Sequence, residues 1–269
     1  MARQFLLMED GQMRRAVGLI PTRFNSRRLP GKSLKIIGNL PMIIHTYRRA
    51  KLAQSLDKVY ICCDTKEVFQ VAKHFKANVM ITSKNHKQGG DRIYEGFKKL
   101  KMKYDQVIDI QGDEPLIDPK NIDHVVSFHR KNKNYDIILP NLPTKFTRDP
   151  NLVRLIFNKH KEVLYLTRSD TPYHFVNKTN KIFKHLSVIS FKPQALKNFA
   201  SFCHKSKLEN LEDIELLRAI DLGLKIKTFS LKGDSFSIDI LKNLIEARKK
   251  MKLDKYYKIY KDQNYETKL

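Results

Sequence analysis

Cysteine, acidic residues and long hydrophobic runs are all scarce in this chain of 269 residues. The three cysteines, of which Cys62 and Cys63 are adjacent, cannot form a disulfide framework and lack the spacing of metal ligands. No stretch approaches the roughly 18 consecutive apolar residues of a membrane-spanning helix. The N-terminal segment has an apolar run only from Phe5 to Met8 and does not have the form of a signal peptide. These absences predict a soluble protein of the cytoplasm.

Acidic residues are outnumbered by basic ones, with 28 Asp and Glu against 52 Lys and Arg, which gives a net charge of +24. Such an excess suits nucleic acids, membrane surfaces or small polyanions such as nucleotides. A nucleic-acid-binding protein would gather its cations on one stripe, with aromatic side chains between them. Lysine is instead spread from Lys32 to Lys268, which indicates compositional bias and a solvated surface. We expect no nucleic-acid partner, and a basic nucleic-acid-binding protein is the less favoured alternative.

The composition, with 41% hydrophobic and 30% charged residues, is that of a folded globular protein. Strand-like and helix-like segments alternate, which is typical of an α/β fold with a mainly parallel sheet flanked by helices. The second half mixes the two, so we expect extra or edge strands there. The expected strands are 16–20, 58–63, 78–82, 106–110, 152–157, 162–167, 183–191 and 225–231, and the expected helices are 42–52, 66–75, 91–100, 208–222 and 240–251.

No repeat or shift in composition marks a linker, and the length suits a single domain. We assign residues 16–251 to this domain and residues 1–15 to an N-terminal extension. Residues 252–269, rich in lysine and tyrosine, are expected to form a basic C-terminal tail or a loosely docked helix.

Three expected strands end in polar residues, and ligands of open parallel sheets bind beyond the carboxyl ends of strands. The first such end, residues 21–32, holds three arginines and Lys32 but neither of the two best-known phosphate-binding motifs. Its cations could wrap a triphosphate through charge-assisted hydrogen bonds, or could be solvated surface. The second end, residues 111–115 (QGDEP), offers Asp113 as a Mg²⁺ ligand or is a plain turn. The third, Asp239, is either functional or the N-cap of the helix that follows.

Taken in order, these stretches and four others resemble the 3-deoxy-manno-octulosonate cytidylyltransferase (CMP-Kdo synthetase) family of sugar-acid cytidylyltransferases. The resemblance covers about residues 17 to 248, and its most specific parts are RLPGK and QGDEP. The matching stretches are IPTRFNSRRLPGKSL (20–34), GGDR (89–92), QGDEP (111–115), YLTR (165–168), KHL (184–186), LENLEDIELLR (208–218) and Asp239.

The resemblance implies a Rossmann-like nucleotide-diphospho-sugar transferase fold and a homodimer that uses CTP and Mg²⁺. The anomeric hydroxyl of a 3-deoxy-2-ulosonic acid would attack the α-phosphate of CTP, giving a CMP-sugar for lipopolysaccharide or capsule synthesis. Such a transfer depends mainly on positioning and charge neutralisation. Arg23, Arg28, Lys32 and Asp113 would be catalytic. Those four would also bind the nucleotide, together with Gly89, Gly90 and Arg92.

For the metal, the resemblance implies Asp113 and Asp239 as ligands. For the sugar acid, it implies Gln111, Arg168, His185 and Glu215. Without the resemblance, His185 would be interpreted as an ordinary buried histidine, and Glu215 with Arg218 as a surface pair on one helix.

Several positions depart from the family pattern. A sugar-contacting tyrosine is replaced by Ile189 and a glutamine by Leu216, so the expected sugar pocket is more apolar. The stretch at Gly89 and Gly90 loses two hydroxyls that lie in the family's base-binding loop. Two enzymatic alternatives follow, namely a cytidylyltransferase for another acid, such as an amino-deoxy octulosonate or a nonulosonate, or a catalytically weak relative.

Overall fold

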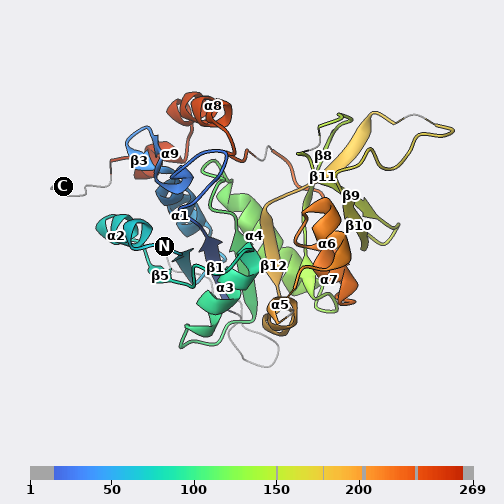
Figure 1. The fold of residues 1–269 in the computed structure, drawn as a ribbon, viewed down its shortest axis with the longest axis horizontal. Helices are drawn as coiled ribbons and strands as arrows, with labels where there is room; N and C mark the ends of the chain where they lie inside the picture. The colour runs from blue at the N-terminus through green and yellow to red at the C-terminus, as the bar shows by residue number, and fades with distance from the viewer. Residues whose placement is uncertain (1–14, 150, 178, 202–203, 234–235, 263–269) are drawn as a thin grey trace.

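The computed structural model describes residues 15–149, 151–177, 179–201, 204–233 and 236–262 (Figure 1). The expected N-terminal extension up to Arg14, Cys203 and the last residues of the expected tail, 263–269, lie outside these residues. Among the described residues, no helix has both the length and the apolar character needed to cross a membrane.

A sheet of seven strands forms the centre of the molecule, in the order β13-β7-β12-β6-β1-β4-β5. The strands beside β1 run parallel to it, whereas β12 is antiparallel to both of its neighbours. Every residue of β1 is buried, because helices cover both faces of a parallel sheet. The strands are β1 (Ala16–Pro21), β4 (Lys58–Cys63), β5 (Val79–Ile81), β6 (Gln106–Ile110), β7 (Ile137–Ile138), β12 (Val188–Phe191) and β13 (Ile226–Lys227).

Helices pack on the two faces of this sheet, as Figure 1 shows for α1 and α4 on one side and α3 and α5 on the other. Each face has its own apolar cluster, built around Ile43 and Val125 on the first and around Ile93 and Phe199 on the second. The helices are α1 (Met42–Leu52), α2 (Lys66–His74), α3 (Gly89–Lys98), α4 (Pro119–Lys131), α5 (Pro193–Ala200), α6 (Lys207–Glu212), α7 (Leu217–Asp221), α8 (Leu241–Lys252) and α9 (Tyr257–Tyr260), with a 3-10 turn at Lys32–Leu34. The predicted α/β class with a mainly parallel sheet flanked by helices is confirmed.

A second sheet, of four strands in the order β10-β9-β11-β8, lies at one end of the molecule (Figure 1). It contains β8 (Asn141–Lys145), β9 (Arg154–Phe157), β10 (Val163–Thr167) and β11 (Lys181–His185), and a two-stranded ribbon of β2 (Ile36–Ile37) and β3 (Leu40–Pro41) lies elsewhere. The prediction of a single strand over 183–191 is wrong. The chain leaves the small sheet after β11 and enters the central sheet as β12, because β11 pairs with β8 while β12 pairs with β6.

The prediction of one helix over 208–222 is also wrong. Asp213 adopts a left-handed conformation, with φ of 50°, and ends α6 before α7 begins at Leu217. Leu211, which would lie on the apolar face of one continuous helix, is instead 82% exposed. The break turns the chain between the two short helices, and Glu215 lies in that connection.

The chain beyond α8 packs back onto the domain. Tyr260 is buried, and its hydroxyl lies 2.9 Å from Nδ1 of the buried His45. The guanidinium of Arg49 forms an ion pair of 2.7 Å with Asp254. The described part of the expected tail therefore takes the docked-helix form, with α9 beside α1.

Candidate active site

The strands β4, β1 and β6 are neighbours and parallel, so the residues that follow them gather at one edge of the central sheet. The loop of residues 22–32 follows β1, Asp64 follows β4, and QGDEP follows β6. This edge is where an open parallel sheet binds its ligands.

Four charged side chains meet at this edge, beyond β1 and β6 (Arg28, Lys32, Asp113 and Asp239). We call this cluster the phosphate end, after the role proposed for it below. The Nζ of Lys32 lies 2.7 Å from Oδ2 of Asp113 and 3.3 Å from Oδ1 of Asp239. Arg28 Nη2 lies 2.9 Å from the same Asp239 oxygen. Three segments that are far apart in the sequence thus meet as the resemblance implies, and Lys32 is not a solvated lysine, since its side chain is 17% exposed.

Asp239 does not cap the helix that follows it. The cap of α8 is Ile240, and the side chain of Asn243 accepts hydrogen bonds from the backbone N–H groups of Asp239 and Ile240. The carboxylate of Asp239 is therefore free to face Arg28 and Lys32. The N–H of Ile238 donates to the carbonyl of Asp113 at 3.0 Å, which ties together the two segments that carry the carboxylates.

The turns around this cluster depend on glycine. Gly31 has φ of 63°, a conformation that disfavours other residues, and it turns the loop so that Lys32 follows at the start of the 3-10 turn. A Cβ on Gly112 would lie 2.8 Å from the backbone oxygen of Pro21, so only glycine allows QGDEP to lie this close to the end of β1. Thr46 of α1 donates to the carbonyl of Gly112 at 3.2 Å.

The phosphate end fits a divalent cation that binds mostly through its substrate. Within the described part of the chain, no group of three or more His, Cys, Asp or Glu residues could hold a metal. Asp113 and Asp239 both lie within 3.3 Å of one ammonium nitrogen, so their oxygens converge on a common position. Mg²⁺ commonly takes one or two carboxylates from the protein and the rest of its ligands from phosphates and water.

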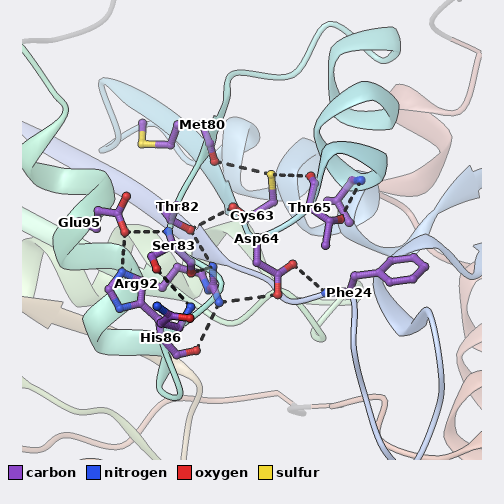
Figure 2. Close-up of polar contacts among 12 residues, drawn as sticks. Phe24, Cys63, Asp64, Thr65, Met80, Thr82, Ser83, His86, Arg92 and Glu95 are labelled. Carbon is purple, nitrogen blue, oxygen red and sulfur yellow. Dashed lines mark hydrogen bonds and ion pairs between the residues drawn. The ribbon is translucent and has the colours of Figure 1, made fainter.

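Arg92, which the resemblance implies as a nucleotide contact, is held by groups of the protein itself in this structure. It is 3% exposed, and its guanidinium donates to Thr82 Oγ1 at 2.7 Å and to the carbonyl of Ser83 at 3.2 Å. It also lies 3.8 Å from Asp64, whose other oxygen accepts from the N–H of Phe24 (Figure 2). Arg92 therefore joins α3 and the loop after β5 to the basic loop. Asp64, to which no site role is assigned from the sequence, is the link, and its position after a strand next to β1 was the available signal.

Gly89 and Gly90 open α3 beside Pro21 and Gln111, at the ends of the same two strands. We call this part of the edge the sugar end, after the role proposed for it below. The N–H of Gly90 donates to Oε1 of Glu215 at 2.8 Å. A Cβ on Gly89 would lie 3.6 Å from Nε2 of Gln111 and 3.7 Å from Oε2 of Glu215, so both side chains border this glycine. Burial raises the pKa of Glu215 to about 7, although the charge of Arg218 opposes this shift.

The interpretation of Glu215 and Arg218 as a surface helix pair is wrong. Arg218 is 2% exposed, and its guanidinium lies 3.0 Å from Glu209 and 3.0 Å from Asp91. Its hydrogen-bonding groups thus join α7 to α6 and α3. Arg218 is buried rather than on a helix surface because the predicted helix over 208–222 is broken at Asp213. The residues after the break take a different course from that helix.

Asp109 is a residue that the sequence interpretation did not single out. It lies in β6 at 4% exposure, and its Oδ2 accepts from Nε2 of Gln111 at 2.9 Å. Its Oδ1 is buried with no hydrogen-bond partner among the described residues. Burial, then the charges of Glu215 and Asp113, raise the pKa of Asp109 well above its usual value. The available signal was a charged residue inside an otherwise apolar strand, VIDI.

Arg168 directly follows β10 of the small sheet, and His185 is the last residue of β11. Nε of Arg168 donates to the carbonyl of Glu212 at 2.8 Å, and its N–H donates to the carboxylate of the same residue at 2.9 Å. Burial lowers the pKa of His185 to about 4, so its ring is neutral near pH 7, and the charge of Arg168 adds to this effect. The carbonyl of Ser187, two residues after His185, accepts from the N–H of Gln111, which connects this region to QGDEP.

Ile189 and Leu216, the two apolar departures, are each 6% exposed. Ile189 pairs with Asp109 in the antiparallel register of β12 and β6, and both it and Leu216 belong to the apolar cluster on the α3 face. Arg23 is exposed, and its charge contributes, after Lys205 and Arg168, to a lowered pKa of Asp213.

Comparison with known proteins agrees with this geometry. A family model described as cytidylyltransferase matches residues 17–226. The 3-deoxy-manno-octulosonate cytidylyltransferase of Thermodesulfovibrio yellowstonii is 35% identical over 248 residues, which are 86% of this chain and 96% of that protein. The 8-amino-3,8-dideoxy-manno-octulosonate cytidylyltransferase of Shewanella oneidensis is 33% identical over 245 residues, which are 88% and 98% of the two chains.

A solved structure of CMP:2-keto-3-deoxy-manno-octonic acid synthetase complexed with CTP superimposes with a TM-score of 0.82 at 28% identity. The match covers 89% of this chain and 99% of that one. Together these findings confirm the resemblance carried by the sequence motifs, and the chain belongs to the cytidylyltransferase family.

Proposed function

We propose that this protein joins CTP to an eight-carbon 3-deoxy-2-ulosonic acid, giving the CMP-sugar acid and pyrophosphate. The anomeric hydroxyl oxygen would form a bond to the α-phosphorus, the bond from that phosphorus to the β-phosphate oxygen would break, and the hydroxyl proton would be released. The observation that carries this proposal is the meeting of Asp113 and Asp239 on Lys32, with Arg28 beside them. The two relatives described above, which act on an octulosonate and on its 8-amino derivative, support the substrate class.

In this proposal the phosphate end holds the triphosphate and its metal. Arg28 and Lys32 pair with carboxylates in the structure, and both present donors suited to phosphate oxygens. Exposed Arg23 lies on the same loop and would reach the phosphates from solvent. Asp113 and Asp239 would bind Mg²⁺, which when bound neutralises phosphate charge and lowers the pKa of the attacking hydroxyl. Lys32 would then turn from the two carboxylates to the phosphates.

The sugar end would hold the acid substrate. A guanidinium can pair with the sugar carboxylate through two parallel hydrogen bonds, and Arg168 is the arginine proposed for this role. Neutral His185 and the carboxyl of Glu215 would orient hydroxyl or amino groups. Gly89 and Gly90 would let the nucleotide lie close to the start of α3, while buried Arg92 would act by holding the loop before that helix.

Pyrophosphate release is the measurement that tests the proposal. The purified protein would be given CTP, Mg²⁺ and one sugar acid at a time, with an octulosonate, its 8-amino derivative and a nine-carbon acid in the panel. We expect release that needs CTP and an eight-carbon acid, and none after chelation of the metal. Release with the nine-carbon acid alone would overturn the assigned substrate, and none with any acid would favour a catalytically weak relative.

We also propose that the enzyme is a homodimer of the cytoplasm, with the small sheet at the interface. Leu164 of β10 is exposed, and so are the side chains of Tyr173, Phe175 and Val176 in the connection to β11. Exposed large apolar side chains on one small sheet and its connection are candidates for a protein interface. Light scattering should give twice the chain mass of 31.6 kDa, and a fully active monomer would remove this assignment.

A further inference from the structure

The hydrogen bonds between β1 and β4 continue past the ends of both strands. The N–H of Thr22 donates to the carbonyl of Cys62 at 2.9 Å. Two residues later the N–H of Phe24 donates at 3.0 Å to Oδ1 of Asp64, which comes two residues after Cys62 (Figure 2). A side-chain carboxylate thus takes the place of the next backbone carbonyl. Because Thr22 and Phe24 are both held, the backbone of Arg23 is fixed on either side.

The ring of Phe24 extends this hold to the turn before Lys32. A Cβ on Gly31 would lie 3.8 Å from two ring carbons of Phe24, so the ring borders the left-handed turn at that glycine. Lys32 follows at once and belongs to the phosphate end. By holding Phe24, Asp64 therefore acts on both ends of the basic loop, at Arg23 and at Lys32.

Asp64 does not cap the helix that follows it. The N-cap of α2 is Thr65, whose hydroxyl accepts from the N–H of Val68 at 3.4 Å. The charge of the Asp64 carboxylate is instead opposed by Arg92, whose Nη2 lies 3.8 Å from Oδ2. Both side chains are largely buried, at 12% and 4% exposure. The carboxylate therefore lies between one partner on the basic loop and one on α3.

Arg92 is itself held by the chain between β5 and α3. Its guanidinium donates to Thr82 Oγ1 and to the carbonyl of Ser83, and the N–H of Ser83 donates to the carboxylate of Glu95 at 2.8 Å (Figure 2). The anchor behind Asp64 is thus a network of several bonds. It gives the carboxylate a fixed place from which to hold the basic loop.

We propose that Asp64 is a positioning residue for CTP: by accepting the N–H of Phe24, it holds the basic loop in the form that binds the triphosphate. Residues 22–32 carry four cations and no acidic residue, and these like charges repel one another. The apparent affinity of a ligand falls with the fraction of molecules that have the binding-competent form, so an anchor on this loop raises the affinity for CTP. The inference rests on the proposed function, in which this loop binds the triphosphate.

The test measures the dissociation constant of CTP by isothermal titration calorimetry, with Mg²⁺ present and no sugar acid. Asp64→Ala removes the acceptor of the Phe24 N–H, and we expect it to raise this constant about 10-fold, since hydrogen bonds to charged groups are among the stronger ones. The KM for CTP should rise by the same factor, with kcat and the KM for the sugar acid nearly unchanged. Asp64→Asn keeps an oxygen that can accept from Phe24, so its affinity should be within about 3-fold of that of the unaltered protein.

Asp57→Ala is the matched control, because Asp57 accepts the N–H of Ala16 at 2.8 Å at the opposite end of β1. Both substitutions remove a carboxylate that holds the backbone beside β1, so both should lower the melting temperature. Only the change at Asp64 should weaken CTP binding. If Asp64→Ala does not fold, Asp64→Ser removes the carboxylate while keeping a small polar side chain, and it should weaken CTP binding in the same way.

An unchanged dissociation constant in Asp64→Ala would overturn the inference. So would an equal loss of affinity in Asp57→Ala, which would indicate a general effect of lower stability, or an Asp64→Asn variant that binds CTP as weakly as Asp64→Ala. Failure of the proposed function has a different result, because the unaltered protein would then bind CTP but release no pyrophosphate with any eight-carbon sugar acid.

Discussion

The phosphate end and the sugar end of the site differ in how their charges are compensated. At the phosphate end, Lys32 and Arg28 lie within 3.3 Å of the carboxylates of Asp113 and Asp239. At the sugar end, Asp109 is buried with one amide donor, and its other oxygen has no hydrogen-bond partner in the part of the chain that the structure describes. Paired charges can exchange protein partners for phosphates and metal at little cost. A buried carboxyl such as that of Asp109, with an incomplete set of hydrogen bonds, favours a ligand that supplies donors. The first arrangement suits chemistry common to many substrates, and the second suits the choice of one.

The largest expected effect tests the phosphate end directly. Asp113→Asn and Asp239→Asn should each lower kcat by about 100-fold or more, because metal stabilisation of transition-state charge contributes several kcal/mol. Neither change should affect the melting temperature greatly, since the amide keeps the shape of the side chain. Asp221→Asn serves as the control with an exposed aspartate. A near-normal rate in either variant at saturating Mg²⁺ would remove that residue from the metal site.

A somewhat smaller effect is expected for the basic loop. Lys32→Ala should raise the KM for CTP by about 10- to 100-fold, because a hydrogen bond to a charged group contributes roughly 1.5–3 kcal/mol. Arg23→Ala should act in the same direction, and Arg27→Ala, an exposed arginine of the same loop, is the matched control. Initial rates over a range of CTP concentrations give the KM for CTP of each variant. If all three variants had the KM for CTP of the unaltered protein, the loop would be a solvated basic surface with no role in binding CTP.

The two glycines at the start of α3 provide a matched pair for the sugar end. A Cβ on Gly90 would lie 2.5 Å from both Glu215 and Phe199, whereas one on Gly89 would have no neighbour closer than 3.5 Å. Gly90→Ala should therefore destabilise the protein by about 1–3 kcal/mol, as overpacking does, while Gly89→Ala should not. Denaturant unfolding of both variants measures the difference. Equal stabilities would mean that Glu215 and Phe199 move without cost, and that the sugar end is less rigid than its burial indicates.

The smallest expected effect is a pH dependence. Glu215 has a pKa raised to about 7 in the folded protein from an ordinary value of 4.5, so between these two values the folded state holds the proton more tightly than the unfolded one. The contribution of Glu215 to stability is thus most favourable below this window and falls as pH rises through it. Glu215→Gln should reduce this loss of stability with rising pH. Denaturant midpoints measured below pH 4.5 and above about pH 7 test this. If the pH dependence of stability were the same in Glu215→Gln, the carboxyl of Glu215 would have a partner that compensates its charge. The two ends of the site would then be more alike.

What the sequence by itself determined lies within short segments. Alternating apolar runs and helical patterns predicted β1, α1, β4 and β6 nearly to their ends, because burial on both faces of a parallel sheet leaves a continuous apolar run. The basic loop and QGDEP could be identified from the sequence as well, because each is a run of polar residues directly after an apolar strand. These patterns depend on the segment itself and not on its neighbours in the fold, so the sequence alone is enough to recognise them.

The tertiary structure alone decided where several of these side chains point. The sequence did not show that Arg92 contacts Thr82 and Asp64, or that Asp109, inside an apolar strand, accepts a hydrogen bond from Gln111. The division of 183–191 between two sheets and the turn at Asp213 were equally invisible, since each depends on pairing with distant strands and helices. The physical reason is common to all four. A charged side chain or a backbone segment goes to the partners that compensate its burial, and those partners are chosen by the packing of the whole domain, not by neighbours in sequence.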